Sequence, residues 1–129
     1  MAVDYRTGSS ALTTDAFSTL AHRIWPREYD AAKTGKALEQ TINIGAWDGD
    51  RLVGSVRILS DGYFFSVVAE IMVDPDYRRQ GVGKELLRRA LEVTPGGTLF
   101  VAAQPGQDRF VEAAGFRRGP NGFVGRRHA

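Results

Sequence analysis

The sequence contains no cysteine and only two histidines, His22 and His128. The lack of cysteine excludes disulfide bonds, thiolate metal sites and a cysteine nucleophile. A structural zinc ion takes about four nitrogen or sulfur ligands, more than two histidines supply, so we expect no metal centre.

Long apolar runs and a strong excess of one charge are also missing. No stretch approaches the ~18 apolar residues that span a bilayer, and residues 1–6 lack the basic and apolar regions of a secretion signal. The net charge is only +2, and the arginines are spread along the chain, unlike those of a nucleic-acid-binding protein. We therefore expect a cytoplasmic protein that binds neither membranes nor nucleic acid.

The residues that are present have the composition of one globular domain. Of the 129 residues, 43% are hydrophobic and 25% charged, which suits a chain with a single core. There is no internal repeat and no linker. We predict one domain over residues 1–129.

The N-terminal third predicts a short strand at residues 3–6 followed by two helices. Apolar side chains recur at helical spacing over residues 13–25 until Pro26 ends the helix. A weaker helix is expected at residues 30–40, because Gly35 lies in its interior.

Extended segments dominate from residue 41 onward. Alternating apolar residues at 42–46 and 52–59 flank an Asp-Gly-Asp turn and predict an antiparallel hairpin. Residues 63–73 are apolar on both faces, which predicts one central strand whose only charge is Glu70.

The C-terminal half begins with a helix near residue 82. A strand at residues 98–103 would run parallel to the strand before that helix, through a right-handed crossover. A short helix at 107–114 and a hairpin of residues 116–118 and 123–126 complete the predicted elements.

The turn before residue 82 carries the most informative pattern, Arg-Arg-Gln-Gly-Val-Gly-Lys at residues 78–84. The first amides of a helix have no intrahelical partner and carry roughly +0.5 charge, and Gly81 and Gly83 keep side chains away from that backbone. Arg78, Arg79 and Lys84 add positive charge that suits phosphate oxygens. The segment predicts a diphosphate site, although a Gly-x-Gly pattern alone equally fits a tight strand-to-helix turn.

Two nucleotide-binding motifs do not fit this segment. The Walker pattern needs Ser or Thr after the lysine, whereas Glu85 follows Lys84, and the dinucleotide fingerprint needs a third glycine, whereas position 86 is leucine. The segment instead resembles the acetyl-CoA loop of the GNAT superfamily of N-acetyltransferases, Arg/Gln-x-x-Gly-x-Gly/Ala.

The resemblance extends over nearly the whole chain and implies an α/β (α+β) fold, the GNAT fold. That fold has a mixed central β-sheet of about six or seven strands flanked by about four helices. A second landmark is Phe-Val-Glu-Ala-Ala-Gly-Phe at residues 110–116, similar to the family's Phe-Tyr-Glu-x-x-Gly-Phe. Val111 replaces a tyrosine thought to protonate the leaving CoA thiolate in many members. A thiol with a pKa near ~8.5 can leave without a dedicated acid.

The resemblance also implies that acetyl-CoA is the acetyl donor, with its pantetheine arm between two splayed parallel strands. A backbone N–H around residues 71–73 would hold the oxyanion when an amine attacks the thioester. The implied acetyl-CoA contacts are Ile71, Met72, Val73, Arg78, Arg79, Gln80, Gly81, Val82, Gly83, Lys84, Gln104 and Phe110.

Glu70 is the candidate general base, because it is the only acid on the strand that lines the reaction centre and burial would raise its pKa. In the alternative interpretation it pairs with an arginine of a neighbouring strand, and a β-bulge would change the face that it occupies. Asp61, Tyr63 and Ser66 are lesser candidates that equally suit turns and packing.

The acceptor amine is predicted to bind near Trp25, Tyr29, Asp61, Tyr63 and the C-terminal hairpin. Residues 69–74 resemble a strand of glucosamine-phosphate N-acetyltransferases, so an amino sugar is one candidate beside arylalkylamines, polyamines, amino acids and protein N-termini. We predict direct acetyl transfer to a small primary amine in a ternary complex. The sequence leaves open whether the protein forms a homodimer. The alternative is an acyl-CoA-binding module or regulatory subunit without strong catalysis, which Val111 would explain.

Overall fold

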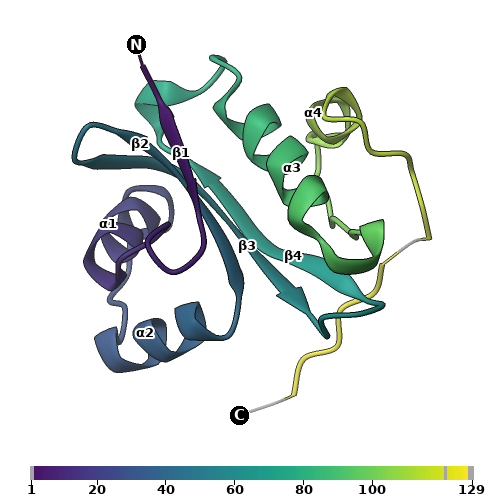
Figure 1. Ribbon diagram of the computed structural model, residues 1–129, viewed down its shortest axis with the longest axis horizontal. Coiled ribbons are helices and arrows are strands. Elements are labelled where there is room, and N and C mark those ends of the chain that lie inside the picture. Colours follow the sequence, from purple (N-terminus) through teal and green to yellow (C-terminus); the bar gives the residue numbers. More distant parts are fainter. Residues whose placement is uncertain (1, 121, 128–129) are drawn as a thin grey trace.

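The computed structural model describes residues 2–120 and 122–127, so His128 lies outside the described residues. Figure 1 shows a central sheet with the N-terminal helices on one face and the C-terminal helices on the other. The elements are β1 (Asp4–Thr7), α1 (Thr14–Ile24), α2 (Ala31–Glu39), β2 (Ile42–Asp48), β3 (Arg51–Ser60), β4 (Ser66–Val73), α3 (Val82–Val93) and α4 (Asp108–Ala113). None of the helices in this part of the chain has the length and hydropathy needed to cross a bilayer.

The predicted N-terminal elements are confirmed, and side-chain caps explain where the helices begin. Thr13 accepts a hydrogen bond from the N–H of Ala16 before α1, and Asp30 accepts one from the N–H of Lys33 before α2. Such caps satisfy backbone donors that a helix start leaves open. The four predicted helices are all present.

The sheet differs from the prediction of a mixed sheet with six or seven strands. Within the described residues it has four strands in the order β1-β2-β3-β4, and all neighbours are antiparallel. The predicted parallel strand at 98–103 is reduced to a bridge between Val67 and Phe100. Proline and glycine turns directly flank this short segment, at residues 95–97 and 105–106, which limits its pairing.

The predicted C-terminal hairpin is also wrong for the residues described, because no strand forms at 116–120 or 122–127. Asn121, in its predicted turn, lies outside the described residues. Phe123 and Val124 are 95% and 77% exposed and only Phe116 packs partly against the core, so the segment buries little apolar surface that would offset the entropy of ordering a hairpin.

The long strand predicted at residues 63–73 begins only at Ser66. The Asp61 carboxylate accepts hydrogen bonds from the N–H groups of Tyr63, Phe64 and Phe65 at 2.8, 2.7 and 3.1 Å. These bonds hold the pKa of Asp61 below its ordinary value and fold residues 61–65 into a turn. β4 is therefore shorter than predicted, and it is an edge strand rather than a central one.

A β-bulge at Ala69 decides which face each β4 side chain occupies. Glu70 and Val68 pair with consecutive residues of β3, which leaves Ala69 without a partner. Val68 and Ile71 consequently pack in the same core beneath α3, whereas Met72 packs in the core beneath α1. Glu70 therefore lies on the α1 face of the sheet, since residues two apart in a strand share a face.

Candidate active site

A cleft of about 570 Å³ lies between the end of β4, the start of α3 and residues 101–111; we call it the β4–α3 cleft. Gln80 is the one predicted acetyl-CoA contact that does not line it, and the Gln80 side chain donates to the Asp76 carbonyl at 3.3 Å. The predicted contacts that do line it are Ile71, Met72, Val73, Arg78, Arg79, Gly81, Val82, Gly83, Lys84, Gln104 and Phe110.

Sequence reasoning missed several other residues of the cleft wall. Most come from the segment after Phe100, where two consecutive alanines could have signalled space for a ligand. The missed residues are Ile24, Tyr77, Val101, Ala102, Ala103, Gln107 and Val111.

The cleft exists because β4 and the segment after Phe100 pair only at their beginnings. The N–H of Val68 donates to the Phe100 carbonyl at 2.9 Å, and the N–H of Phe100 donates to the Ser66 carbonyl at 3.0 Å. No further ladder joins the two segments within the described residues. Both then line the cleft, so the predicted opening beside β4 is present.

The backbone at the end of β4 has a defined polarity. The N–H of Asp74 donates to the Val53 carbonyl of β3 at 2.8 Å. Because hydrogen-bonding direction alternates along an antiparallel strand, the N–H and C=O groups of Ile71 and Val73 are directed away from β3, toward the open edge. The Arg78 side chain donates to the Val73 carbonyl at 3.2 Å, in agreement with this direction. An extended ligand can pair with this edge.

The turn into α3 leaves its N-terminus uncovered. Gly81 has φ +84°, and its side-chain position is open, with no atom within 4 Å of a Cβ built there. No side chain caps α3, and the first helical hydrogen bond runs from the Glu85 N–H to the Gly81 carbonyl at 3.0 Å. The amides before Glu85 therefore lack intrahelical partners, and Arg78, Arg79 and Lys84 line the same cleft.

Gly83 serves a packing role that the sequence pattern did not reveal. A Cβ atom at this position would lie 2.8 Å from Cε1 and 2.9 Å from Cζ of Phe110. The absence of a side chain at Gly83 therefore admits the Phe110 ring of α4 against α3, in addition to the role at the ligand site that the sequence predicts.

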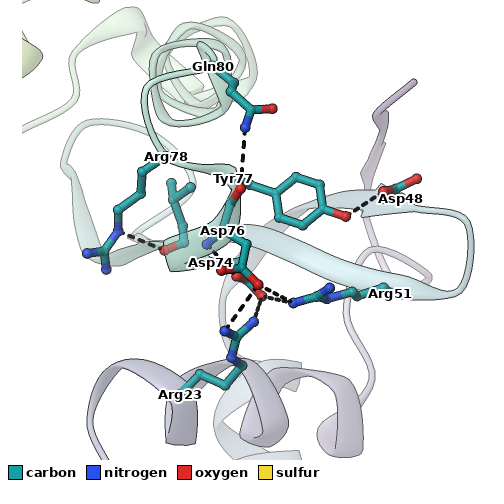
Figure 2. A network of polar contacts seen from close by, with 9 residues as sticks. Arg23, Asp48, Arg51, Asp74, Asp76, Tyr77, Arg78 and Gln80 are labelled. Carbon is teal, nitrogen blue, oxygen red and sulfur yellow. Dashed lines mark hydrogen bonds and ion pairs between the residues drawn. The ribbon is translucent and has the colours of Figure 1, made fainter. Parts of the chain in front are cut away.

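A buried carboxylate fastens the beginning of this turn to two other elements (Figure 2). The Asp74 side chain is 1% exposed and accepts hydrogen bonds from Arg23 of α1 and, at 2.9 Å, from Arg51 of β3. Its other oxygen accepts the N–H of Asp76 at 2.9 Å. Burial acts to raise the pKa of Asp74, but the Asp76 amide and the two guanidinium groups outweigh it, so the pKa lies below its ordinary value.

The tyrosine ring in the cleft wall belongs to Tyr77. Its hydroxyl donates to Asp48 at 2.5 Å (Figure 2), and this hydrogen bond raises the pKa of Tyr77. Val111 also lines the cleft, at the position where the resemblance led us to expect a tyrosine. No other tyrosine lines the cleft among residues 2–120 and 122–127.

A second cavity of about 790 Å³ lies on the other face of β4, against α1 and α2; we call it the α1–α2 pocket. Trp25 and Met72 line both cavities, so the two meet at these residues. Of the predicted acceptor-binding residues, Trp25 and Tyr29 line this pocket, whereas Asp61 and Tyr63 line neither cavity. Its wall also contains three arginines that were not singled out, Arg27, Arg57 and Arg126, of which Arg27 and Arg126 lie in segments predicted to bind the acceptor.

Glu70 lies in the wall of the α1–α2 pocket rather than in the β4–α3 cleft. Its two carboxylate oxygens accept hydrogen bonds from Nε and Nη2 of Arg57 at 2.5 and 2.6 Å. The ion pair with a neighbouring strand, our alternative interpretation of Glu70, is thus present. The role of Glu70 as general base stays a prediction.

No cluster of three or more acidic or histidine side chains that could hold a metal ion occurs in the described part of the chain. Three features of the two cavities can contact a ligand. They are the open β4 edge, the α3 N-terminus with its cations, and the Glu70–Arg57 pair. This arrangement suits an extended ligand with a diphosphate in one cavity and a smaller molecule in the other.

Comparison with sequence families gives one domain-length match. The family described as "Acetyltransferase (GNAT) domain" matches residues 10–125. The match therefore includes every residue that lines the β4–α3 cleft and every element except the first strand. It also includes the wall of the α1–α2 pocket except Arg126.

Curated relatives match the chain over 58% of its length. GCN5-related N-acetyltransferase 2, chloroplastic, of Arabidopsis thaliana is 33% identical over 78 residues, or 30% of that protein. Histone acetyltransferase TAP1 of Glycine max is 36% identical over 80 residues, or 34% of that protein. The matched region thus spans about a third of the length of these relatives.

Solved structures share the fold at low sequence identity. A probable acetyltransferase of meticillin-resistant Staphylococcus aureus has a TM-score of 0.78 at 17% identity, with 97% of this chain and 100% of that chain covered. The structure of AAC(6')-Iy with a CoA-containing bisubstrate analog has a TM-score of 0.76 at 15% identity, with all of both chains covered.

Proposed function

The chain belongs to the GNAT family of acetyltransferases, and from this we propose that it transfers an acetyl group from acetyl-CoA to a small primary amine in a ternary complex. The observation that carries the proposal is the meeting of two cavities at Trp25 and Met72. One cavity has the groups that a CoA diphosphate needs, and the other can hold the amine.

Acetyl-CoA binds in the β4–α3 cleft. Its diphosphate accepts hydrogen bonds from the first amides of α3, and Arg78, Arg79 and Lys84 supply the balancing charge. Its pantetheine arm pairs with the outward-directed backbone of Ile71 and Val73. This places the thioester near Met72, where the two cavities meet.

The amine enters from the α1–α2 pocket. Its ammonium form loses one proton to Glu70, directly or through a water molecule, and the free amine nitrogen attacks the thioester carbonyl and releases a second proton to solvent. An outward N–H of Ile71 or Val73 stabilises the oxyanion. The new C–N bond forms, the C–S bond breaks, and the thiolate leaves into a cleft whose tyrosine hydroxyl is bonded to Asp48, so solvent protonates it.

Free-thiol release from acetyl-CoA with a panel of primary amines tests this proposal. We expect release that depends on the amine, and an acetylated product by mass spectrometry. Gly81→Val is the control, because a β-branched side chain at φ +84° distorts the α3 N-terminus and weakens donor binding.

A binding module without catalysis is the second candidate, favoured by Val111 and by the Glu70–Arg57 pair. Calorimetric binding of acetyl-CoA without thiol release from any amine would support it and contradict catalysis.

A further inference from the structure

The charges in the α1–α2 pocket limit which amines it suits, if the proposed function is right. Its wall contains three arginines and one acid, Glu70. Glu70 and Arg57 neutralise each other through two hydrogen bonds. Arg27 and Arg126 have no carboxylate within ion-pair distance among the residues that the structure describes.

The Arg27 guanidinium is held in place without using its hydrogen-bond donors. Its carbon lies 4.8 Å from the centre of the Tyr29 ring, and the Tyr29 hydroxyl is anchored on the Trp25 carbonyl at 2.9 Å. A guanidinium stacked on an aromatic face keeps its N–H groups available to bind an oxyanion.

Arg126 reaches the same pocket from the C-terminal segment. Two cations without a partner in one cavity repel a polycationic substrate and attract an anionic one. The rest of the wall is mostly apolar or aromatic, with Phe17, Leu38 and Trp25 among its residues, so the body of the bound molecule has a surface to pack on.

We propose that the acetyl acceptor is a small amine that also carries an anionic group, a carboxylate or a phosphate, which Arg27 and Arg126 bind. Polyamines and aminoglycosides are then poor substrates, although the fold is shared with AAC(6')-Iy.

Matched pairs of amines test this inference. Tryptophan and tryptamine differ by a carboxylate. Glucosamine 6-phosphate and glucosamine differ by a phosphate. We expect at least one anionic member to have a kcat/KM roughly 10-fold or more above that of its partner, as one charge-assisted contact suggests. Which pair shows the preference identifies the anion.

Substitution of the two arginines adds a second measurement. Arg27→Ala and Arg126→Ala should each raise KM for the preferred anionic amine by roughly 10-fold, with little change in kcat or in KM for the partner that lacks the anionic group. Arg88→Ala is the matched control, because Arg88 is an exposed α3 arginine paired with Glu85 and Glu92.

A binding readout separates failure of this inference from failure of the proposed function. Calorimetry with the same amine pairs, in the presence of desulfo-CoA, needs no turnover. Preferred binding of an anionic amine supports the inference even if no amine is acetylated. Equal or tighter binding of spermidine or of the amines that lack the anionic group, or turnover of those amines that is as fast, overturns it.

Discussion

Glu70 combines two possible tasks in one side chain, because it pairs with Arg57 and also lines the α1–α2 pocket. A carboxylate has about four lone-pair sites, and Arg57 uses two of them. Glu70 can therefore remain paired and still accept a proton from an amine or from an intervening water molecule.

Replacing Glu70 with glutamine removes the proton acceptor and keeps the volume. We expect kcat to fall by roughly 10²-fold or more at neutral pH, with acetyl-CoA affinity nearly unchanged. Steady-state kinetics and calorimetry measure the two quantities, and Arg57→Lys serves as a control that keeps the carboxylate. A fully active Glu70→Gln enzyme would assign proton removal to another group.

Asp74 is the residue whose charge matters most for the turn that precedes α3. Asp74→Asn removes the buried carboxylate that Arg23 and Arg51 share and leaves them only the exposed Asp76, at 3.4 and 3.5 Å, so we expect a loss of unfolding free energy of about 2 kcal/mol. This is less than for a fully buried pair because both arginines are partly exposed. Asp76→Asn, at a side chain that is 66% exposed, is the control and should have little effect in the same denaturant titration.

The lowered pKa of Asp74 also predicts the direction of its pH dependence. A carboxyl whose folded-state pKa lies below its unfolded value stabilises the fold above the unfolded pKa, about 3.9, and loses this contribution as the pH falls through the folded pKa. The stability difference between the parent protein and Asp74→Asn should therefore shrink in acid. A difference that is constant from neutral pH to pH 2 would contradict an ionised Asp74.

At the scale of elements, α3 and α4 are joined where Gly83 meets Phe110. Gly83→Ala would force the ring outward into the β4–α3 cleft, which it lines. We expect acetyl-CoA to bind roughly 10-fold more weakly, and Phe110→Leu in the same protein to restore much of the affinity, because the two changes compensate in volume.

Gly81→Ala provides the comparison for this pair. The added Cβ would meet no neighbour, and the loss of acetyl-CoA affinity would come from strain at φ +84°. Phe110→Leu should therefore not restore the affinity of this variant. Calorimetry on the single and double variants measures the coupling, and equal rescue at both glycines would argue against the packing role of Gly83.

At the scale of the whole molecule, the β4–α3 cleft and the α1–α2 pocket lie on opposite faces of β4 and meet at Trp25 and Met72. No tyrosine hydroxyl is free in the β4–α3 cleft of the described residues, since Tyr77 donates to Asp48. No tyrosine in this cleft is therefore available to protonate the leaving thiolate.

The pH profile of kcat/KM tests this arrangement. We expect the rate to rise with pH on one acidic limb, as the amine and its base lose protons, and to show no fall near ~10 from a tyrosine. Tyr77→Phe should leave the shape unchanged. A high-pH limb that disappears in Tyr29→Phe would show that a tyrosine of the α1–α2 pocket donates the proton instead.

Much of the fold follows from local patterns that the sequence determines by itself. The capped helices α1 and α2, the β2–β3 hairpin and the strand–turn–helix around residues 78–84 depend on residues close to one another in the chain. Periodicity, caps and turn residues encode such elements directly. The same local pattern identified the part of the β4–α3 cleft formed by the turn before α3, whereas most of the wall formed by residues 101–111 was missed.

Only the tertiary structure decided the features that join distant segments. The bulge at Ala69 and the pairing of β4 with β3 determine that Glu70 meets Arg57, and no short window contains both residues. The α1–α2 pocket likewise gathers Arg27 and Arg126 from opposite ends of the chain. Strand number also depended on long-range pairing, because a short apolar run becomes a strand only where a partner strand and a buried face are available to it.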